Sequence, residues 1–570
     1  MTETSTTSQA WLMSDDQFKK LIAVLIAGVA TLIAVIAFLQ SDASARDDRA
    51  NRDTKRYSMQ AMGRQVGGEA RANYDYDRAY QAYYEFDLLA ESAANVGDEA
   101  AARRYESLRD RMKSLSPLLA APYFDPASGE VNIARYEADT YVVETTALTE
   151  RFLAASKVKD AWDYKSNTYI IHVTLLAVAL FLYGLSATLS GRIARWIFTG
   201  TGTLVALVGV GWAALLFAQP VPDLRDCKTA DGAYAIDAFA QGVGLAYQNQ
   251  HDQAVASFDK ALACAPDYSN AHVERGNSNM ALGKYAAAAS DFEKAQASGD
   301  QTANVAGELA WAYYLQGRFD DAVNMNRTAL KAVPDELWIR FDLGLSLLAS
   351  GQIDGAKSEY ADGMKMAAQQ VADAKAAGAE PPSYLWWSLD DGAISLEDLV
   401  GTLEAGTGNP PPQSVANPDA VKEAATEVIG QLKSLAVALE YSGKPPAGEL
   451  AATISPFAFA EPVSDDQGNV VDYNQAESFA YGIDDVSVLF DYSGMQDGQD
   501  VVFKVYVDDQ EDPSWRIAEP WSLGASGSAE KPISFAYSNV HVLRPGEYAV
   551  EMYVASHLAQ RGKFVVEPGS

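Results

Sequence analysis

The sequence AIDAFAQGVGLAYQNQHDQAVASFDKALACAPDY, residues 235–268, opens a stretch that ends with LWIRFDLGLSLLASGQIDGAKSEYADGMKMAA, residues 337–368. Aligned at a period of 34 residues, four consecutive segments keep the same residue classes in the same columns without any shift of register. A constant period of this length predicts stacked helical hairpins, each of which needs its neighbours to bury its apolar face.

Five columns carry the pattern, and each has a physical role. Small side chains let two helices approach closely, and Gly turns the chain between them; a further column is biased toward aromatic residues. The columns are Gly242, Gly276, Ala310 and Gly344; Asn249, Gly283, Gly317 and Gly351; Ala254, Ala288, Ala322 and Ala356; Phe258, Phe292, Asn326 and Tyr360; and Ala261, Ala295, Ala329 and Gly363. Pro266 and Pro334 end the first and third repeats.

This pattern resembles the tetratricopeptide repeat (TPR) family over residues 235–368, as four repeats. Asn326 in the aromatic column and Asp300 in place of a closing proline depart from the family pattern. The resemblance implies a right-handed superhelix, an α-solenoid, whose concave groove is lined by the first helix of each repeat. The corresponding groove residues are Phe239, Tyr247, Asn270, Asn277, Asn304, Trp311, Tyr314, Trp338 and Phe341.

Aromatic side chains in such a groove are good anchors for a peptide or a partner helix, and Asn can hydrogen-bond a partner's backbone. Some family members bind a C-terminal carboxylate with groove Lys and Arg, which these positions lack. We therefore expect an apolar-aromatic groove that binds a protein or peptide segment. Alternatively, Trp338 and Phe341 pack against residues 369–450, which follow the repeats.

Three uncharged runs predict transmembrane helices at residues 21–39, 169–189 and 196–218. Each is long enough to cross a hydrocarbon core of roughly 30 Å. The first run follows a tail, residues 1–20, and exceeds the usual length of a signal-peptide core, so we expect an uncleaved anchor. Cleavage near Ala43 is the alternative.

The second and third runs form a hairpin, so residues 40–168 and everything after residue 218 must lie on one side of the membrane. Lys19, Lys20, Arg192 and Arg195 flank the runs at short segments, where the positive-inside rule applies best. This places the N-terminus in the cytoplasm of a multi-pass cell-membrane protein and the other soluble parts outside the cytoplasm.

Cys227 and Cys264 are the only two cysteines, and both follow the third run. In an oxidising compartment they can form a disulfide that ties the segment after the membrane to the first repeat. Two unrelated buried thiols are the alternative.

Residues 40–168 read as a helical bundle in which the first and second spans continue outward from the membrane. Tyr76, Tyr80, Tyr83 and Tyr84 recur at helical spacing and predict one aromatic face, which more often forms bundle core than a ligand pocket. Chemoreceptor sensor domains share this outline, so a ligand sensor is one alternative function.

Residues 369–450 read as a helical cap with a Pro-rich linker, with Trp386-Trp387 in an irregular stretch. Residues 451–570 instead contain short runs rich in β-branched and aromatic residues, which predict an antiparallel β-sandwich. It is similar in outline to immunoglobulin or fibronectin modules. The predicted strands are 486–491, 501–507, 533–537, 548–554 and 563–566. The fold class is thus a mostly α, multi-domain membrane protein with a β-sandwich at its end.

The charge is uneven, with 22 Lys and Arg against 51 Asp and Glu in residues 221–570, out of a net charge of −32 for all 570 residues. Nucleic-acid binding is disfavoured because it needs clustered cations. The sequence has no nucleotide-binding, zinc-protease or serine-hydrolase motif, and its five histidines are scattered. We therefore expect no catalytic residues, no metal, no cofactor and no enzyme activity.

The expected function is a membrane-anchored scaffold that binds a protein segment in the repeat groove. Alternatives are a ligand sensor through residues 40–168 and a structural subunit of a larger membrane assembly. In the first span, Ala23, Ala27, Ala30 and Ala34 permit close helix packing and hence homo- or hetero-oligomers.

Overall fold

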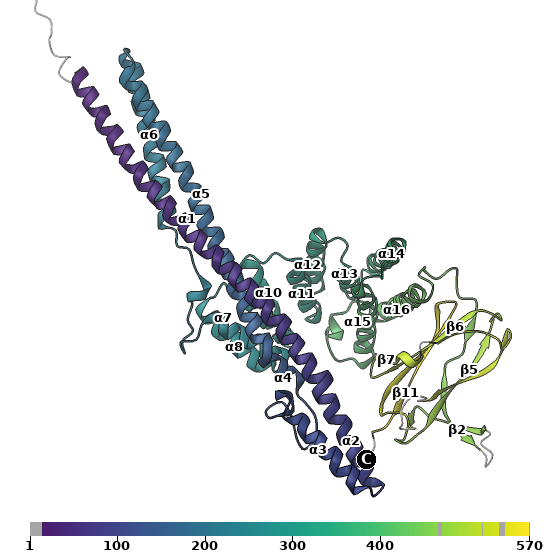
Figure 1. The fold of residues 1–570 in the computed structure, drawn as a ribbon. Coiled ribbons are helices and arrows are strands. Elements are labelled where there is room, and N and C mark those ends of the chain that lie inside the picture. The colour runs from purple at the N-terminus through teal and green to yellow at the C-terminus, as the bar shows by residue number, and fades with distance from the viewer. Residues whose placement is uncertain (1–13, 465–469, 516, 535–541, 569–570) are drawn as a thin grey trace, which may run out of the picture. The chain divides into compact units, whose positions relative to one another are not determined.

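The computed structural model describes residues 14–464, 470–515, 517–534 and 542–568 (Figure 1). Most of the predicted N-terminal tail and residues 535–537 of one predicted strand lie outside them. The chain forms two compact units, Met1–Gly283 and Lys284–Ser570, called here the N-terminal and C-terminal units and described separately.

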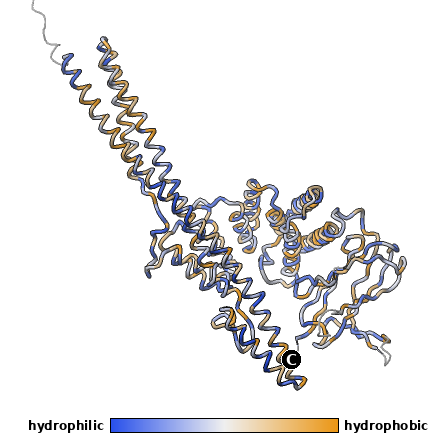
Figure 2. The backbone as a smooth tube through the Cα atoms, viewed as in Figure 1, coloured by the Kyte–Doolittle hydropathy of each residue, from blue (hydrophilic) through white to orange (hydrophobic). Residues whose placement is uncertain are grey.

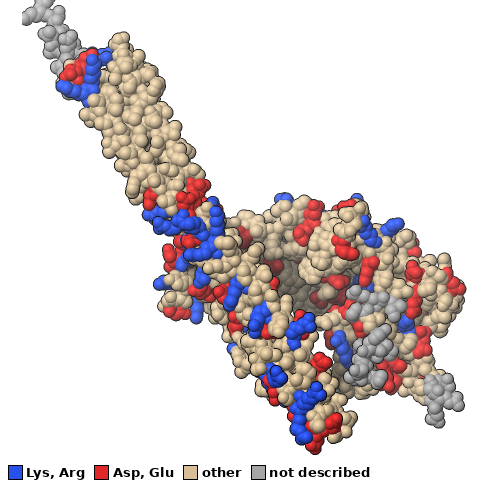
Figure 3. Space-filling model, viewed as in Figure 1, with Lys and Arg blue, Asp and Glu red and all other residues tan. Residues whose placement is uncertain are grey.

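The N-terminal unit is built on three long helices, α1 (Asp15–Tyr74), α5 (Val143–Thr188) and α6 (Arg192–Ala218). Each is long and apolar enough to cross a membrane by length and composition. Their apolar stretches lie together and share one core, which includes Ile22, Leu176 and Ala213 (Figure 2). Lys, Arg, Asp and Glu gather at the two ends of this bundle and leave its surface between them uncharged (Figure 3).

Between α1 and α5 the chain forms a small helical domain, and α1 and α5 run into it without a break. Its elements are η1 (Asp75–Tyr80), α2 (Gln81–Asn95), α3 (Glu99–Lys113), η2 (Pro117–Leu119), α4 (Ile133–Glu137) and η3 (Ala138–Val142). The predicted single tyrosine face is wrong in part. Tyr83 is buried beside Phe124, but Tyr76 and Tyr84 are exposed. The reason is that η1 is π-helical, which shifts the 3.6-residue periodicity on which the prediction rests.

The predicted repeats appear as helical hairpins whose first helices begin at residues 235, 269, 303 and 337. The N-terminal unit holds α7 (Ala235–Tyr247), α8 (His251–Cys264) and α9 (Ser269–Ala281). The C-terminal unit holds α10 (Tyr285–Ala297), α11 (Ala303–Leu315), α12 (Phe319–Ala332), α13 (Leu337–Ala349) and α14 (Ile353–Ala377). All four residues of the turn column have positive φ, between 57° at Asn249 and 84° at Gly351, which is why Gly and Asn occur there.

The small and aromatic columns pack against each other within a repeat. A Cβ atom on Gly242 would lie 2.5 Å from the ring of Phe258, and one on Gly344 would lie 2.7 Å from the ring of Tyr360. Asn326 occupies the aromatic column of the third repeat and is buried, and neither polar atom of its amide has a partner among the described residues.

Two helices follow the repeats, α15 (Ser383–Ala405) and α16 (Pro418–Tyr441), with η5 (Pro412–Ser414) between them. The prediction that Trp386 and Trp387 lie in an irregular stretch is wrong, because both belong to the first turns of α15. Pro382 stands at the N-cap of that helix, where the missing N–H of proline costs no helical hydrogen bond.

Residues 451–568 form two sheets. Strands β1 (Thr453–Ile454), β2 (Ala458–Ser464), β3 (Val470–Gln475), β5 (Asp485–Ser493) and β9 (Ser526–Ser534) make the first. Strands β4 (Ser478–Phe479), β6 (Asp500–Val507), β7 (Gln510–Glu511), β8 (Ile517–Pro520), β10 (Gly546–Val554) and β11 (His557–Val566) make the second, and η6 (Pro513–Trp515) lies between β7 and β8. All pairings are antiparallel except that of β11 with β4. One apolar core takes side chains from both sheets, such as Val488 of β5 and Val550 of β10.

A buried ion network joins the β region to α15 and α16. Glu551 of β10 is fully buried, and its carboxylate lies 2.7 Å from the Lys433 ammonium of α16. Burial alone would raise the pKa of Glu551, but Lys433, Tyr553 and Arg561 together hold it below its usual value. Lys504 of β6 bonds Glu440 of α16 at 2.9 Å. The sequence pattern does not predict this coupling, because the partners lie on separate elements.

The glycine–aromatic packing predicts a specific cost for a larger side chain in the small column. Gly344→Val should destabilise the fourth repeat by about 1–3 kcal/mol, because its methyl groups overlap the Tyr360 ring. The matched control is Gly401→Val on α15, where no atom lies near the added Cβ. Hydrogen exchange of peptides from α13 and α14 should accelerate for Gly344→Val and not for Gly401→Val, and equal rates in both variants would contradict the packing.

Candidate binding face of the helical repeats

In the N-terminal unit, the inner face of the first repeat is covered by the chain's own helix α5. Ala147 and Ala154 lie two turns apart on α5 and pack with Ile236 and Ala240 of α7, and all four side chains are buried. Nearby, Gly244 of α7 lies against Val143, so close that a Cβ atom could not fit. The small residues on both helices allow this close approach.

Polar contacts fix the same interface. The Glu150 carboxylate of α5 is 6% exposed and accepts hydrogen bonds from the Tyr268 hydroxyl at 2.8 Å and from the Asn270 amide at 2.7 Å. Burial raises the pKa of Glu150, and these two hydrogen bonds oppose the rise. Arg151 bonds Asp237 of α7 at 2.6 Å. The buried carboxylate is therefore satisfied by the repeat itself.

These contacts correct part of the predicted groove. Phe239 is 3% exposed and packs against Phe258 and Tyr268 in the core of the first repeat. Asn270 holds Glu150, and the Tyr247 hydroxyl donates to Glu137 at 2.5 Å. Phe239 and Asn270 therefore serve the fold, the first as core of the repeat and the second as a partner of α5. Tyr247 bonds α4 and stays 44% exposed. Asn277 is exposed.

The segment before the first repeat is held by a disulfide and by ion pairs. Cys227 is joined by a disulfide to Cys264 at the end of α8, with Cα atoms 6.0 Å apart. Arg225, in η4 (Leu224–Asp226), bonds Asp223 at 2.6 Å and Asp53 of α1 at 3.1 Å. The first repeat is thus attached to the long helices by a covalent link, ion pairs and apolar packing.

In the C-terminal unit the predicted groove residues divide into core and accessible groups. Tyr314 is 2% exposed and stacks on Trp311, with ring centroids 5.0 Å apart, while Trp311 itself stays partly exposed. Trp338 is partly exposed and lies against Gly307. Asn304 is exposed at the start of α11.

Phe341 is the clearest correction in this unit, because it is 2% exposed and stacks on Tyr360, with centroids 5.6 Å apart. A Cβ atom on Gly392 of α15 would lie 3.0 Å from the Phe341 ring. Phe341 therefore packs against residues 369–450, as the alternative expectation has it, and it does not line an open groove.

Helix α15 also brings carboxylates to the first helices of the third and fourth repeats. We name this group the acidic-aromatic cluster. It consists of Glu308 and Trp311 with Tyr314 on α11, Asp342 on α13, Tyr360 on α14, and Asp391 and Asp398 on α15. Asp342 and Asp391 are partly exposed, and Asp398 is exposed. The sequence does not indicate this cluster, because its carboxylates come from three separate helices.

The electrostatics of the cluster are dominated by like charge. Burial, then the charges of Asp391 and Glu308, raise the pKa of Asp342 well above its usual value. Burial and the charges of Asp398 and Asp390 raise the pKa of Asp391. Burial, followed by the charges of Asp342 and Asp398, also raises the pKa of the Tyr314 phenol. The carboxylates of the cluster therefore act on one another and on the neighbouring Tyr314 phenol.

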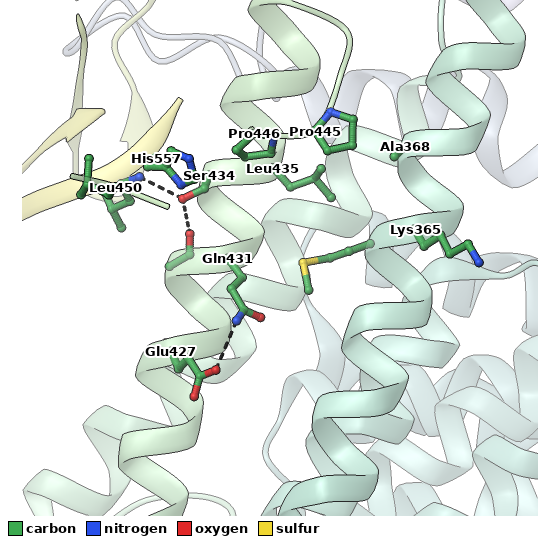
Figure 4. A pocket seen from close by; sticks show the side chains of 13 residues that line it. Lys365, Ala368, Glu427, Gln431, Ser434, Leu435, Pro445, Pro446, Leu450 and His557 are labelled. Atoms are coloured by element: carbon green, nitrogen blue, oxygen red, sulfur yellow. Dashed lines mark hydrogen bonds between the residues drawn. The ribbon is translucent and has the colours of Figure 1, made fainter. Parts of the chain in front are cut away.

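A separate cavity of about 590 Å³ lies between α14, α16 and β11 (Figure 4). Its walls are mostly apolar, with Met364, Leu435, Pro445, Pro446 and Leu558 among the lining residues. The Ser434 hydroxyl of α16 accepts a hydrogen bond from the Leu558 amide at 2.9 Å and donates to the Gly430 carbonyl at 2.5 Å. The cavity thus marks the place where the β region meets the helices that follow the repeats.

No protein-family profile matches the chain, and no curated protein matches it. Among solved structures, the chain is similar to YrrB, described as a TPR protein with an unusual peptide-binding site, at 21% identity over 30% of this chain and 91% of YrrB, with a TM-score of 0.23. It is also similar to MamA AMB-1, at 23% identity over 27% of this chain and 88% of that protein, with a TM-score of 0.23. MamA from Desulfovibrio magneticus RS-1 shares 17% identity over 33% of this chain and 94% of that chain, also at 0.23.

The raised pKa of Asp342 predicts how its neutral analogue behaves. A carboxyl group whose pKa is higher in the folded than in the unfolded protein does not destabilise the fold below its unfolded pKa, about 3.9. As the pH rises from there through the folded pKa, the group destabilises the fold increasingly. Asp342→Asn should therefore raise the free energy of unfolding at about pH 7, and this gain should fall toward zero near about pH 4.

Urea unfolding of the full chain in detergent, followed by tryptophan fluorescence at the two pH values, measures this difference. Asp320→Asn, an exposed carboxylate on α12, is the control and should show no such pH-dependent gain. A loss of stability for Asp342→Asn at about pH 7, or the same gain at both pH values, would contradict the assigned electrostatics.

Proposed function

We propose that this protein is a membrane-anchored scaffold that binds a segment of another protein on the first helices of its third and fourth repeats. Helical repeats of this kind present extended surfaces for protein partners. The observation that carries the proposal is the partly exposed aromatic surface of Trp311 and Trp338. The equivalent face of the first repeat is covered by α5, but this surface remains accessible. We propose a binding role and no catalysis.

The membrane anchor is part of the same proposal. Three helices of sufficient length and apolar character, with charged residues at both ends of their bundle, support it. The short connection Gly191–Arg195 and the N-terminal flank carry Lys and Arg, which favours the cytoplasm for both. The repeats and the β region would then be extracytoplasmic, where a disulfide between Cys227 and Cys264 is stable.

The binding face is tested by removing the Trp311 ring alone. Tyr314 is unsuitable, because its removal would open the core. Trp311→Ala should reduce recovery of the protein's partners in a pull-down from detergent-solubilised membranes by at least about tenfold, as expected for an aromatic anchor worth roughly 2 kcal/mol. Tyr481→Ala, an exposed aromatic side chain in the β region, is the matched control. Equal recovery with both variants would refute this binding face.

The topology is tested by thiol labelling of intact cells with a membrane-impermeant maleimide. We expect labelling of Cys227 and Cys264 only after reduction, because the disulfide blocks both thiols on an accessible side. A cysteine introduced at Asn304, which is exposed on α11, provides a control for access because it needs no reduction. Labelling of all three positions only after cell lysis would place the repeats in the cytoplasm.

A further inference from the structure

We propose that the acidic-aromatic cluster binds lysine or arginine side chains of the partner segment, so that the partner is a basic peptide or helix. This inference rests on the proposed function and specifies the chemistry of its ligand. The groove positions predicted from the repeat pattern contain no such charges, and the carboxylates are added by Asp342 of α13 and by helix α15.

Helix α15 carries carboxylates and apolar side chains on one accessible face. Trp387, Asp391, Ile394 and Asp398 follow one another at intervals of four, three and four residues, which places them along one face of the helix. Trp387 is 55% exposed and Ile394 is 47% exposed. The face therefore combines accessible apolar surface with two carboxylates. Asp391 and Asp342 lie where α15 packs on α13, because a Cβ atom on the adjacent Gly392 would be 3.0 Å from the ring of the adjacent Phe341.

Two other buried or partly buried carboxylates of the same unit have cationic partners. Glu551 pairs with Lys433 and Glu359 with Arg340, each at 2.7 Å. Among the described residues, neither Asp342 nor Asp391 forms an ion pair. Partly buried carboxylates without a counter-charge are costly, so a cationic ligand would relieve an unfavourable arrangement that the fold itself leaves in place.

The cluster also contains a buried hydroxyl without a hydrogen-bond partner among the described residues. Tyr360 is 1% exposed, and its hydroxyl has no hydrogen-bond partner in the part of the chain that the structure describes. The Tyr360 ring stacks on Phe341, the chain neighbour of Asp342, with centroids 5.6 Å apart. Burial, followed by the charges of Asp342, Tyr314 and Asp391, raises the pKa of this phenol. Its oxygen can accept a hydrogen bond from an ammonium or guanidinium group, and the described part of the fold supplies no such partner.

The aromatic surface of the cluster favours an organic cation over a metal ion. Trp311 is stacked on Tyr314 and partly exposed, and Trp faces attract Lys and Arg side chains. Within the described residues, no group of three His, Cys, Asp or Glu side chains is arranged to hold a metal ion. Lysine and arginine match both features, because they carry an apolar stem and a charged head.

The test is fluorescence anisotropy with the full chain in detergent micelles and a labelled peptide in which lysine alternates with alanine. We expect binding of this peptide and none of the matched peptides that carry glutamate or glutamine in place of lysine. The double variant Asp342→Asn, Asp391→Asn should bind the lysine peptide at least about tenfold more weakly, because two charge-assisted contacts are lost.

The control variant Asp320→Asn, Asp335→Asn removes the same net charge from exposed positions of the same unit and should bind like the wild type. Equal weakening in both double variants would assign the affinity to net charge alone and overturn the site. Absence of lysine-peptide binding to the wild type would also overturn it. Neither result affects the proposed function, because the Trp311→Ala pull-down tests partner binding without assuming a basic ligand.

Circular dichroism separates lost binding from lost structure in these variants. Both double variants should retain the helical spectrum of the wild type, because Asn is nearly isosteric with Asp and removes repulsion from the cluster. A folded Asp342→Asn, Asp391→Asn variant that binds the lysine peptide as tightly as the wild type does would refute the inference.

Discussion

The packing of small side chains against large ones at a constant 34-residue interval is the constraint on which the helical array depends. Gly242 against Phe258 and Gly344 against Tyr360 set how closely two helices of a repeat approach. Because each hairpin has an inner face that it cannot cover by itself, the array needs further elements. Helix α5 covers the first repeat, and α15 packs on α13 in the fourth.

The sequence predicts the parts of the fold that depend on local interactions. The helix starts at 235, 269, 303 and 337 and the left-handed turns at Asn249 and Gly351 follow from the repeat pattern, because each is determined within a few residues. The long apolar helices are equally local. By contrast, the π-helical turn at Asp75–Tyr80 has no clear sequence signature, so the tyrosine spacing predicts the wrong face.

The candidate site is harder to predict, because its composition depends on which distant helix covers each repeat. Phe239 and Phe341 occupy the same position in their repeats and both are buried. Yet Phe239 packs against Tyr268 at the N-cap of α9, and Phe341 packs against Gly392 of α15. Nothing near Asn270 in the sequence indicates that its partner is Glu150, 120 residues earlier. The same holds for Asp342 and Asp391, whose proximity follows from the placement of α15 on α13.

The two covered faces differ in a way that distinguishes a structural contact from a binding surface. At the first repeat, the buried carboxylate of Glu150 receives two hydrogen bonds, and Arg151 has Asp237 as its partner. At the fourth repeat, Asp342 and Asp391 meet further carboxylates, and the Tyr360 hydroxyl is left without a partner among the described residues. A contact that serves only stability would resemble the first, because unpaired buried charge and unsatisfied hydroxyls reduce stability. The cost carried by the second face is therefore best explained by a ligand that supplies the missing positive charge.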